Sequence, residues 1–254
     1  MDFIDYKLNN TSILSYFYNS HHYQAFYLLF MVSFFFCFII DFVWGVKVLK
    51  VWEWTDYGVI EFVCMYLFMN ISFVLSIYEL YRVIKTLLKK YIPDENLFSL
   101  RLSSLRKRLF YKACLILGIV FFISPLYMVI YNLHHLEPYI LIFPFTSITL
   151  ITDAVTYFTG GQPVLEQFIH FNRLKSATIA ATIFSAFIVT EGLNTFGGEW
   201  QYLRVPFYNI RFFTVPLSVL IGWIPLVVGM ISMVNMVKHL SYKASSHKSL
   251  SSFT

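Results

Sequence analysis

The sequence EGLNTFGGEWQYLRVPFYNIRFFTVPLSVLIGW, residues 191–223, connects two apolar segments through a turn that is rich in glycine, aromatic and polar residues. Glu191 and Asn194 stand at the end of the first apolar segment, and Trp223 stands in the early turns of the second. A simple connection between two helices needs none of these side chains. This stretch therefore holds most of the candidate chemistry of the chain.

The composition of the whole chain is that of a membrane protein. Of its 254 residues 58% are hydrophobic and 13% are charged, and the charged share is about half that of ordinary globular proteins. A helix needs about 20 mostly apolar residues to cross a bilayer. The segments that meet this condition are 23–44, 57–84, 109–133, 138–158, 176–191 and 212–237. The predicted fold is all-α, a polytopic membrane helix bundle with about six transmembrane helices.

The polar segments divide the chain without suggesting a second domain. We expect a single integral membrane domain over residues 1–254. Its polar parts are an N-terminal segment (1–22), a basic cytoplasmic loop (85–108) and a C-terminal tail (239–254). Because a polar segment precedes the first apolar segment, we expect the first helix to act as an uncleaved membrane anchor.

The distribution of basic residues predicts the orientation of the bundle. If the loop 85–108 is cytoplasmic, fifteen of the 19 Lys and Arg residues lie on that side. This excess on one side predicts cytoplasmic N- and C-termini and a location in the plasma (inner) membrane. Orientation and contact with anionic membrane lipid account for the positive net charge, so no role in nucleic-acid binding is expected.

Two of the predicted helices carry the features expected of a central pair. Glu61 and Glu79 are eighteen residues apart and share one face of the second helix. Acidic residues in spanning helices normally face the bundle interior. Glu79 precedes Arg82 by three residues, which predicts a local ion pair, so Glu61 is the better functional candidate. The fifth helix has small residues spaced four apart, such as Ala177 and Ala181, which allow close packing. We expect these two helices to be neighbours at the centre.

The predicted topology brings two carboxyl groups to one level of the membrane. Glu61 begins the second helix at the outer side, and Glu191 ends the fifth helix there. The side chains expected to complete this site as substrate-binding residues are Asn194, Trp200, Tyr202 and Trp223. Two nearby carboxylates do not both ionise cheaply, so one of them should hold a proton near neutral pH. The alternative is that each acid meets a separate basic partner, such as Arg204 or Arg211.

The order of residues in this region resembles a known group of membrane proteins. The residues that carry the resemblance are Glu191, Gly197-Gly198, Trp200, Tyr202, Val215-Pro216-Leu217 and Trp223. They are similar to the carboxy-terminal half of carotenoid-biosynthesis membrane proteins, namely the carotenoid hydratase family and the small heterodimeric-type lycopene cyclases. The family's Phe-Gly-x-Tyr-x-Tyr run is replaced by Gly-Gly-Glu-Trp-Gln-Tyr, and Ile60-Glu61-Phe62 holds one acid where the cyclases have two.

The resemblance implies acid-catalysed cyclisation or hydration of an isoprenoid or carotenoid, the chemistry of an isomerase or a lyase, with no cofactor. Glu61 or Glu191 would protonate a double bond. Trp200, Tyr202 and Trp223 would stabilise the carbocation through their ring faces. The lipid-soluble substrate would enter sideways from the membrane.

Two other classes of function stay open at this point. Acidic residues inside membrane helices also mark ion or proton paths, which is typical of a small-solute or ion transporter. A non-catalytic membrane subunit or assembly partner, in a homo- or hetero-oligomer, fits as well. No metal site is expected, because the adjacent His134 and His135 lack the H-x-x-x-H spacing of helical zinc sites. Walker, dinucleotide and G-x-S-x-G motifs are also missing from the sequence.

Overall fold

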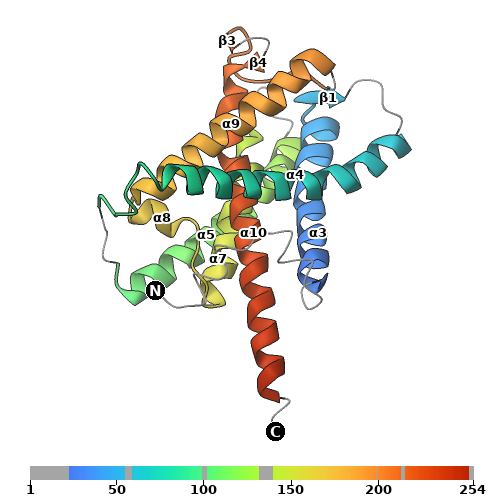
Figure 1. Ribbon diagram of the computed structural model, residues 1–254. Coiled ribbons are helices and arrows are strands. Elements are labelled where there is room, and N and C mark those ends of the chain that lie inside the picture. The colour runs from blue at the N-terminus through green and yellow to red at the C-terminus, as the bar shows by residue number, and fades with distance from the viewer. Residues whose placement is uncertain are drawn as a thin grey trace.

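Each of the six apolar stretches contains a helix among its described residues in the computed structural model of the protein, which is all-α and 76% helical (Figure 1). The long helical segments are α3 (Tyr23–Cys37) continued by the π-helix η1 (Phe38–Val48), α4 (Val59–Leu88), α5 (Ser104–Tyr131), α7 (Ile142–Phe158), α9 (Arg173–Gly197) and α10 (Leu217–Ser251). The short elements are α8 (Glu166–Ile169) and the strands β1 (Trp52–Trp54), β2 (Trp200–Tyr202), β3 (Arg211–Phe212) and β4 (Val215–Pro216).

The structure describes residues 23–54, 59–98, 102–131, 140–198, 200–212 and 215–251. Within these ranges the side chains of 23–24, 59–69 and 245–251 are outside the description.

Four helical segments are long and apolar enough to cross a membrane. They are Ala25–Val48, Ser104–Tyr131, Arg173–Gly197 and Leu217–Ala244. The helix α7 is apolar but has 17 residues, which corresponds to about 25 Å at 1.5 Å per residue, less than the ~30 Å hydrocarbon core of a bilayer. The helix α4 has 30 residues and lies across α10 and α3 rather than alongside them (Figure 1).

The last helix, α10, occupies the centre of the bundle and packs against α3, α4, α7 and α9. Its middle turns, residues 227–234, are buried on all sides, and Gly229 allows the helix to approach α7, since a Cβ atom there would lie 3.0 Å from the Ile148 Cβ. The predicted contact between α4 and α9 is confirmed. The prediction that these two helices form the centre is wrong, because α10 is apolar around its whole circumference and fills that position.

Several predicted boundaries move in the structure. The helix α9 continues beyond Glu191 to Gly197, where Gly198 ends it with a φ of 66° and donates its N–H to the Asn194 carbonyl at 2.7 Å. Glycine adopts this left-handed conformation without strain, which makes Gly198 a favourable position for the end of the helix. Similarly, α10 runs through the predicted polar tail to Ser251, and the predicted basic loop is helical at both ends.

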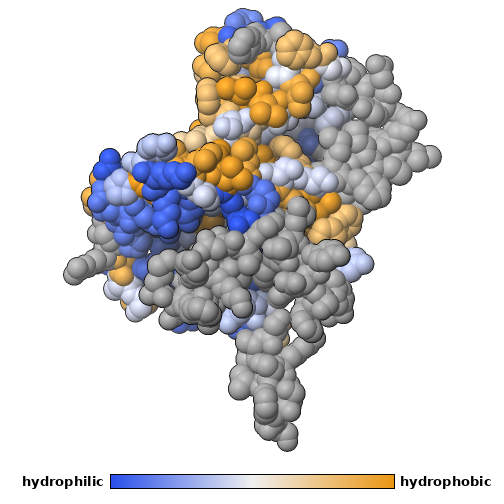
Figure 2. Space-filling model, in the orientation of Figure 1, coloured by the Kyte–Doolittle hydropathy of each residue, from blue (hydrophilic) through white to orange (hydrophobic). Residues whose placement is uncertain are grey.

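The polar segments at one end of the bundle hold each other by ion pairs. The Arg173 Nη1 atom lies 3.0 Å from the Glu95 Oε1, and Lys107 pairs with Glu166. The connection between α4 and α5 therefore lies against α8 and the start of α9. Figure 2 shows hydrophilic side chains gathered at this edge of the molecule, while apolar side chains cover the region of α9.

A short antiparallel pair of strands closes the opposite end. The strand β1 pairs with β2 so that Trp52 lies opposite Tyr202 and Trp54 lies opposite Trp200. Side chains alternate between the two faces of a strand. These four aromatic residues consequently share the inner face, and the exposed Glu53 points away from it.

Candidate functional site

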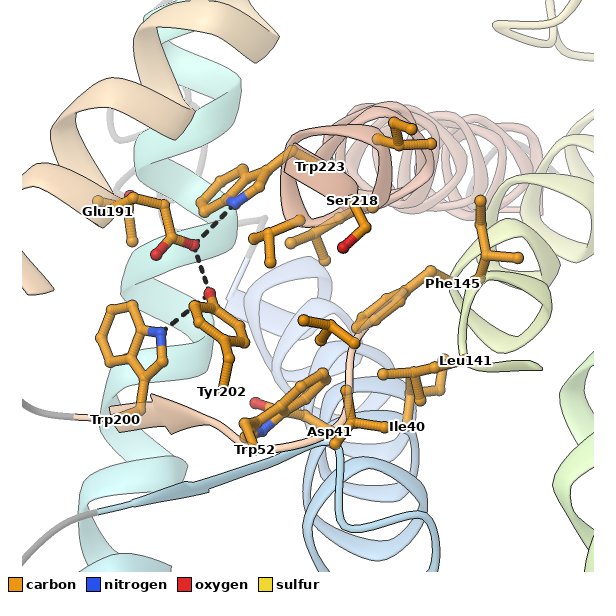
Figure 3. A pocket seen from close by; sticks show the side chains of 18 of the residues that line it. Ile40, Asp41, Trp52, Leu141, Phe145, Glu191, Trp200, Tyr202, Ser218 and Trp223 are labelled. Carbon is orange, nitrogen blue, oxygen red and sulfur yellow. Dashed lines mark hydrogen bonds between the residues drawn. The ribbon is translucent and has the colours of Figure 1, made fainter. Parts of the chain in front are cut away.

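A cavity of ≈ 390 Å³ lies beside this strand pair, between α3–η1, α4, α7, α9 and α10. Most of its lining is apolar, with a few polar side chains among aliphatic and aromatic ones (Figure 3). Its volume falls within the ~300–1,000 Å³ typical of small-molecule sites. The polar and charged residues of the lining are Asp41, Asn70, Thr190, Glu191 and Ser218.

Glu191 is the most deeply buried carboxyl group of this cavity, with an exposed fraction of 3%. Its Oε1 atom accepts two hydrogen bonds, from the Tyr202 hydroxyl at 2.6 Å and from the Trp223 Nε1 at 3.0 Å (Figure 3). Its Oε2 atom is buried and has no hydrogen-bond partner among the described residues. The two oxygens of one carboxyl group thus have different environments, and the second is available to a ligand or carries a proton.

The aromatic wall is held in place by a second set of hydrogen bonds. The Trp200 Nε1 donates to the Tyr202 hydroxyl at 3.0 Å, so Trp200, Tyr202 and Glu191 form a chain. The Asn194 side chain binds the Trp200 backbone twice, accepting from its N–H at 3.0 Å and donating to its carbonyl at 3.1 Å. Asn194 is outside the described cavity lining, and in this geometry it positions Trp200.

Tyr202 remains a hydrogen-bond donor to Glu191 over the whole physiological pH range. Burial of its hydroxyl raises the pKa of Tyr202 well above its ordinary value, and the nearby Glu191 carboxyl raises it further. Both effects disfavour the phenolate, because a second negative charge in an apolar site is costly. The proton between Tyr202 and Glu191 is therefore supplied by the tyrosine.

The predicted partnership of Glu61 with Glu191 stays a prediction. The backbone of Glu61 belongs to α4, but its side chain lies outside the described part of the structure. The alternative partners do not pair with Glu191, which forms no ion pair with any described residue. Arg211 instead donates its Nε–H to the Tyr208 carbonyl at 3.2 Å and lies 4.3 Å from the centre of that ring.

Asp41 is a cavity residue that the sequence analysis did not include in the site. It lies on the π-helix η1, and its side chain lies beside Trp52 in the lining of the cavity (Figure 3). The signal was present in the sequence, since an acid in an otherwise apolar spanning helix indicates a functional position. The π-helix that turns Asp41 toward the cavity could not be predicted from the sequence, because π-helical segments are rare.

The cavity combines acidic groups with aromatic rings. Five of its lining residues are indole or phenol rings, namely Trp52, Trp54, Trp200, Tyr202 and Trp223. None of the described lining residues is Lys, Arg or His. No group of three described His, Cys, Asp or Glu side chains is placed to hold a metal ion, and His134 and His135 lie outside the described residues.

A comparison of this chain with models of known protein families, with curated proteins and with solved structures finds no match. The functional argument therefore depends on the geometry of the cavity.

Proposed function

We propose that the chain is an integral membrane protein with six spans and with both termini on the cytoplasmic side of the plasma (inner) membrane. Six alternating crossings put the α4–α5 connection and the α8 region on one side, and β1 and β2 on the other. The ion pair between Arg173 and Glu95 and the pairing of Trp52 with Tyr202 both agree with this arrangement.

We further propose that the cavity binds a lipid-soluble isoprenoid or carotenoid, and that Glu191 donates a proton to one of its double bonds. The observation that carries this proposal is the asymmetric carboxyl group of Glu191. Its Oε1 accepts from Tyr202 and Trp223, as the carbonyl oxygen of a neutral acid does, while Oε2 keeps no described partner. The mostly apolar lining suits a hydrocarbon substrate.

The chemistry that follows needs no cofactor. The O–H bond of Glu191 breaks, a C–H bond forms on the substrate, and the adjacent carbon becomes a carbocation. In a cyclisation, a second double bond of the substrate attacks this cation, and the ring cation then loses a proton to a carboxylate. In a hydration, water adds instead and loses the proton. Either way the acid is regenerated, which is the requirement for general acid–base catalysis.

The aromatic side chains stabilise the cationic intermediate in this proposal. The rings of Trp200, Tyr202 and Trp223 border the cavity close to Glu191. An aromatic face attracts a cation within about 6 Å of its centre. Glu61 keeps its proposed role as a second acid. The single variants Glu61→Gln and Glu191→Gln separate the roles of the two acids.

The test is a comparison of lipid extracts by mass spectrometry, from cells with and without the gene. We expect an isoprenoid or carotenoid whose mass is unchanged but whose retention shifts, or whose mass increases by one water. Glu191→Gln should reduce this product by at least about 100-fold, while Glu61→Gln measures the contribution of the second acid. Glu53→Gln is the matched control, because Glu53 is exposed on the outer face of β1.

Other outcomes would contradict the enzyme. An unchanged lipid profile together with an altered flux of ions or small solutes would support a transporter. Loss of the protein from the membrane in Glu191→Gln, along with loss of product, would identify Glu191 as a structural acid.

A further inference from the structure

The wall of the cavity formed by η1 and β1 carries a carboxyl group that the proposed chemistry of Glu191 does not require. Asp41 lies there beside Trp52, across the cavity from Trp223, and Tyr202 lies between the two sides (Figure 3). Asp41 forms no ion pair with a described residue.

Asp41 has no basic partner among the described residues of the cavity lining. Glu191 carries its proton in the proposed function, so Asp41 is the carboxyl group of this cavity whose charge a ligand can balance. Basic residues of the same end of the molecule are engaged elsewhere: the Lys47 Nζ lies 5.2 Å from the centre of the Phe42 ring, and Arg211 lies over Tyr208. An ionised carboxylate in an apolar cavity is very costly unless a cation accompanies it, so a ligand cation would relieve this cost.

The aromatic groups of the same wall are also suited to a cation. Trp52 and Trp54 project from β1 into the cavity, and the rings of Trp54 and Trp200 lie 5.3 Å apart. Indole has the strongest attraction for cations among the aromatic side chains, and several such rings around a carboxylate are the usual recognition mode for quaternary ammonium groups. A hydrocarbon alone would need neither the carboxyl group nor so many indoles.

We propose that Asp41, Trp52 and Trp54 form a subsite that binds the positively charged head of an amphiphile, a quaternary ammonium group on an alkyl chain. The head lies between the Asp41 carboxylate and the indole faces, and the alkyl chain occupies the rest of the cavity, whose lining is mostly apolar. The inference uses the cavity of the proposed function but requires no reaction there, so it stands or falls on binding alone.

The experiment compares two esters that differ by one atom in the head. Lauroylcholine carries a trimethylammonium group, and 3,3-dimethylbutyl laurate has a carbon in place of the nitrogen and no charge. Each is titrated into the full-length protein in nonionic detergent micelles, with tryptophan fluorescence as the readout and empty micelles as the correction for partitioning. We expect lauroylcholine to bind about tenfold more tightly than the neutral ester, by the magnitude of a desolvated cation–aromatic contact.

Two variants locate the subsite. Asp41→Asn should lower the ratio of the two affinities, because only the attraction of the indole rings is left, while the neutral ester binds as before, which also shows that the cavity is intact. Glu53→Gln, on the exposed face of the same strand, should leave the ratio unchanged. Equal affinities of the two esters in the wild-type protein would overturn the inference without any variant, and so would an Asp41→Asn protein whose preference for the ammonium ester equals that of the wild type.

The failure of this inference is distinguishable from failure of the proposed function. A lipid product that depends on Glu191, combined with no preference for the ammonium ester, contradicts the cation subsite alone. A clear preference for the ammonium ester, combined with an unchanged lipid profile, contradicts the enzyme and keeps the subsite.

Discussion

Two buried carboxyl groups, Asp153 near one end of the bundle and Glu191 near the other, differ in how their oxygens are satisfied. Asp153 is completely buried, and both of its oxygens accept hydrogen bonds: Oδ2 from the Leu165 N–H at 2.6 Å and Oδ1 from the Ser232 hydroxyl. Glu191 is almost as buried, but only its Oε1 has described partners.

The difference separates a structural acid from a candidate functional one. Asp153 connects α7 to the following turn and to α10, and it lies outside the described cavity lining. Glu79 is likewise engaged, in an ion pair with Arg82 at 2.9 Å. Buried polar groups are normally satisfied. The acid that is buried and only half satisfied is therefore the one whose environment calls for a ligand or a proton.

The all-or-none prediction concerns the side of the membrane on which the two ends lie. Cysteine replaces Tyr91, which is exposed beyond the end of α4, or Glu53, which is exposed on β1. In spheroplasts a membrane-impermeant maleimide should label the Glu53→Cys protein and should label the Tyr91→Cys protein only after lysis. The unmodified chain measures the background from its own cysteines. Labelling of both single variants from the outside would contradict six spans with cytoplasmic termini.

The next largest effect is on stability, which should fall more when Asp153 is replaced than when Glu191 is replaced. Asp153→Asn should lower the free energy of unfolding by about 2 kcal/mol, because an amide can accept only through one atom and leaves a buried donor unsatisfied. Glu191→Gln should change it by less than about 1 kcal/mol, since the amide oxygen can still accept from Tyr202 and Trp223.

Chemical unfolding of both proteins in nonionic detergent measures this difference. Equal destabilisation by the two variants would remove the distinction between the structural and the functional acid.

A smaller effect is expected at Tyr202. The substitution Tyr202→Phe removes the donor to Glu191 and the acceptor of Trp200, two hydrogen bonds at the cavity wall. It should lower the free energy of unfolding by about 1 kcal/mol. The matched control is Tyr157→Phe, whose ring centre lies 4.3 Å from that of Tyr111 and whose hydroxyl forms no hydrogen bond with a described residue. The free energy of unfolding of the control should stay within about 0.5 kcal/mol of the wild type. An equal loss of stability in both variants would contradict a stabilising role of the hydrogen bonds among Trp200, Tyr202 and Glu191.

Several local features of this molecule could be predicted from neighbouring residues alone. The ion pair between Glu79 and Arg82 follows from their spacing of three on a helix, and the structure confirms it. The lining role expected of Trp223 follows from its depth in an apolar helix, and it does border the cavity. The last turns of α9 were harder to place, because the helix continues through Gly192 and Gly197 and ends only at Gly198.

The amino-acid sequence by itself determined the helical, membrane-type character of the chain, because hydrophobicity over twenty successive residues and the position of basic residues are properties of short segments. Only the tertiary structure decided which acidic residues line the cavity. Asp41 reaches it through a π-helix, whose wider turn breaks the α-helical spacing from which faces are predicted. Trp52 and Trp54 reach it through the pairing of β1 with β2. Both depend on contacts between segments far apart in the chain, and no local pattern contains them.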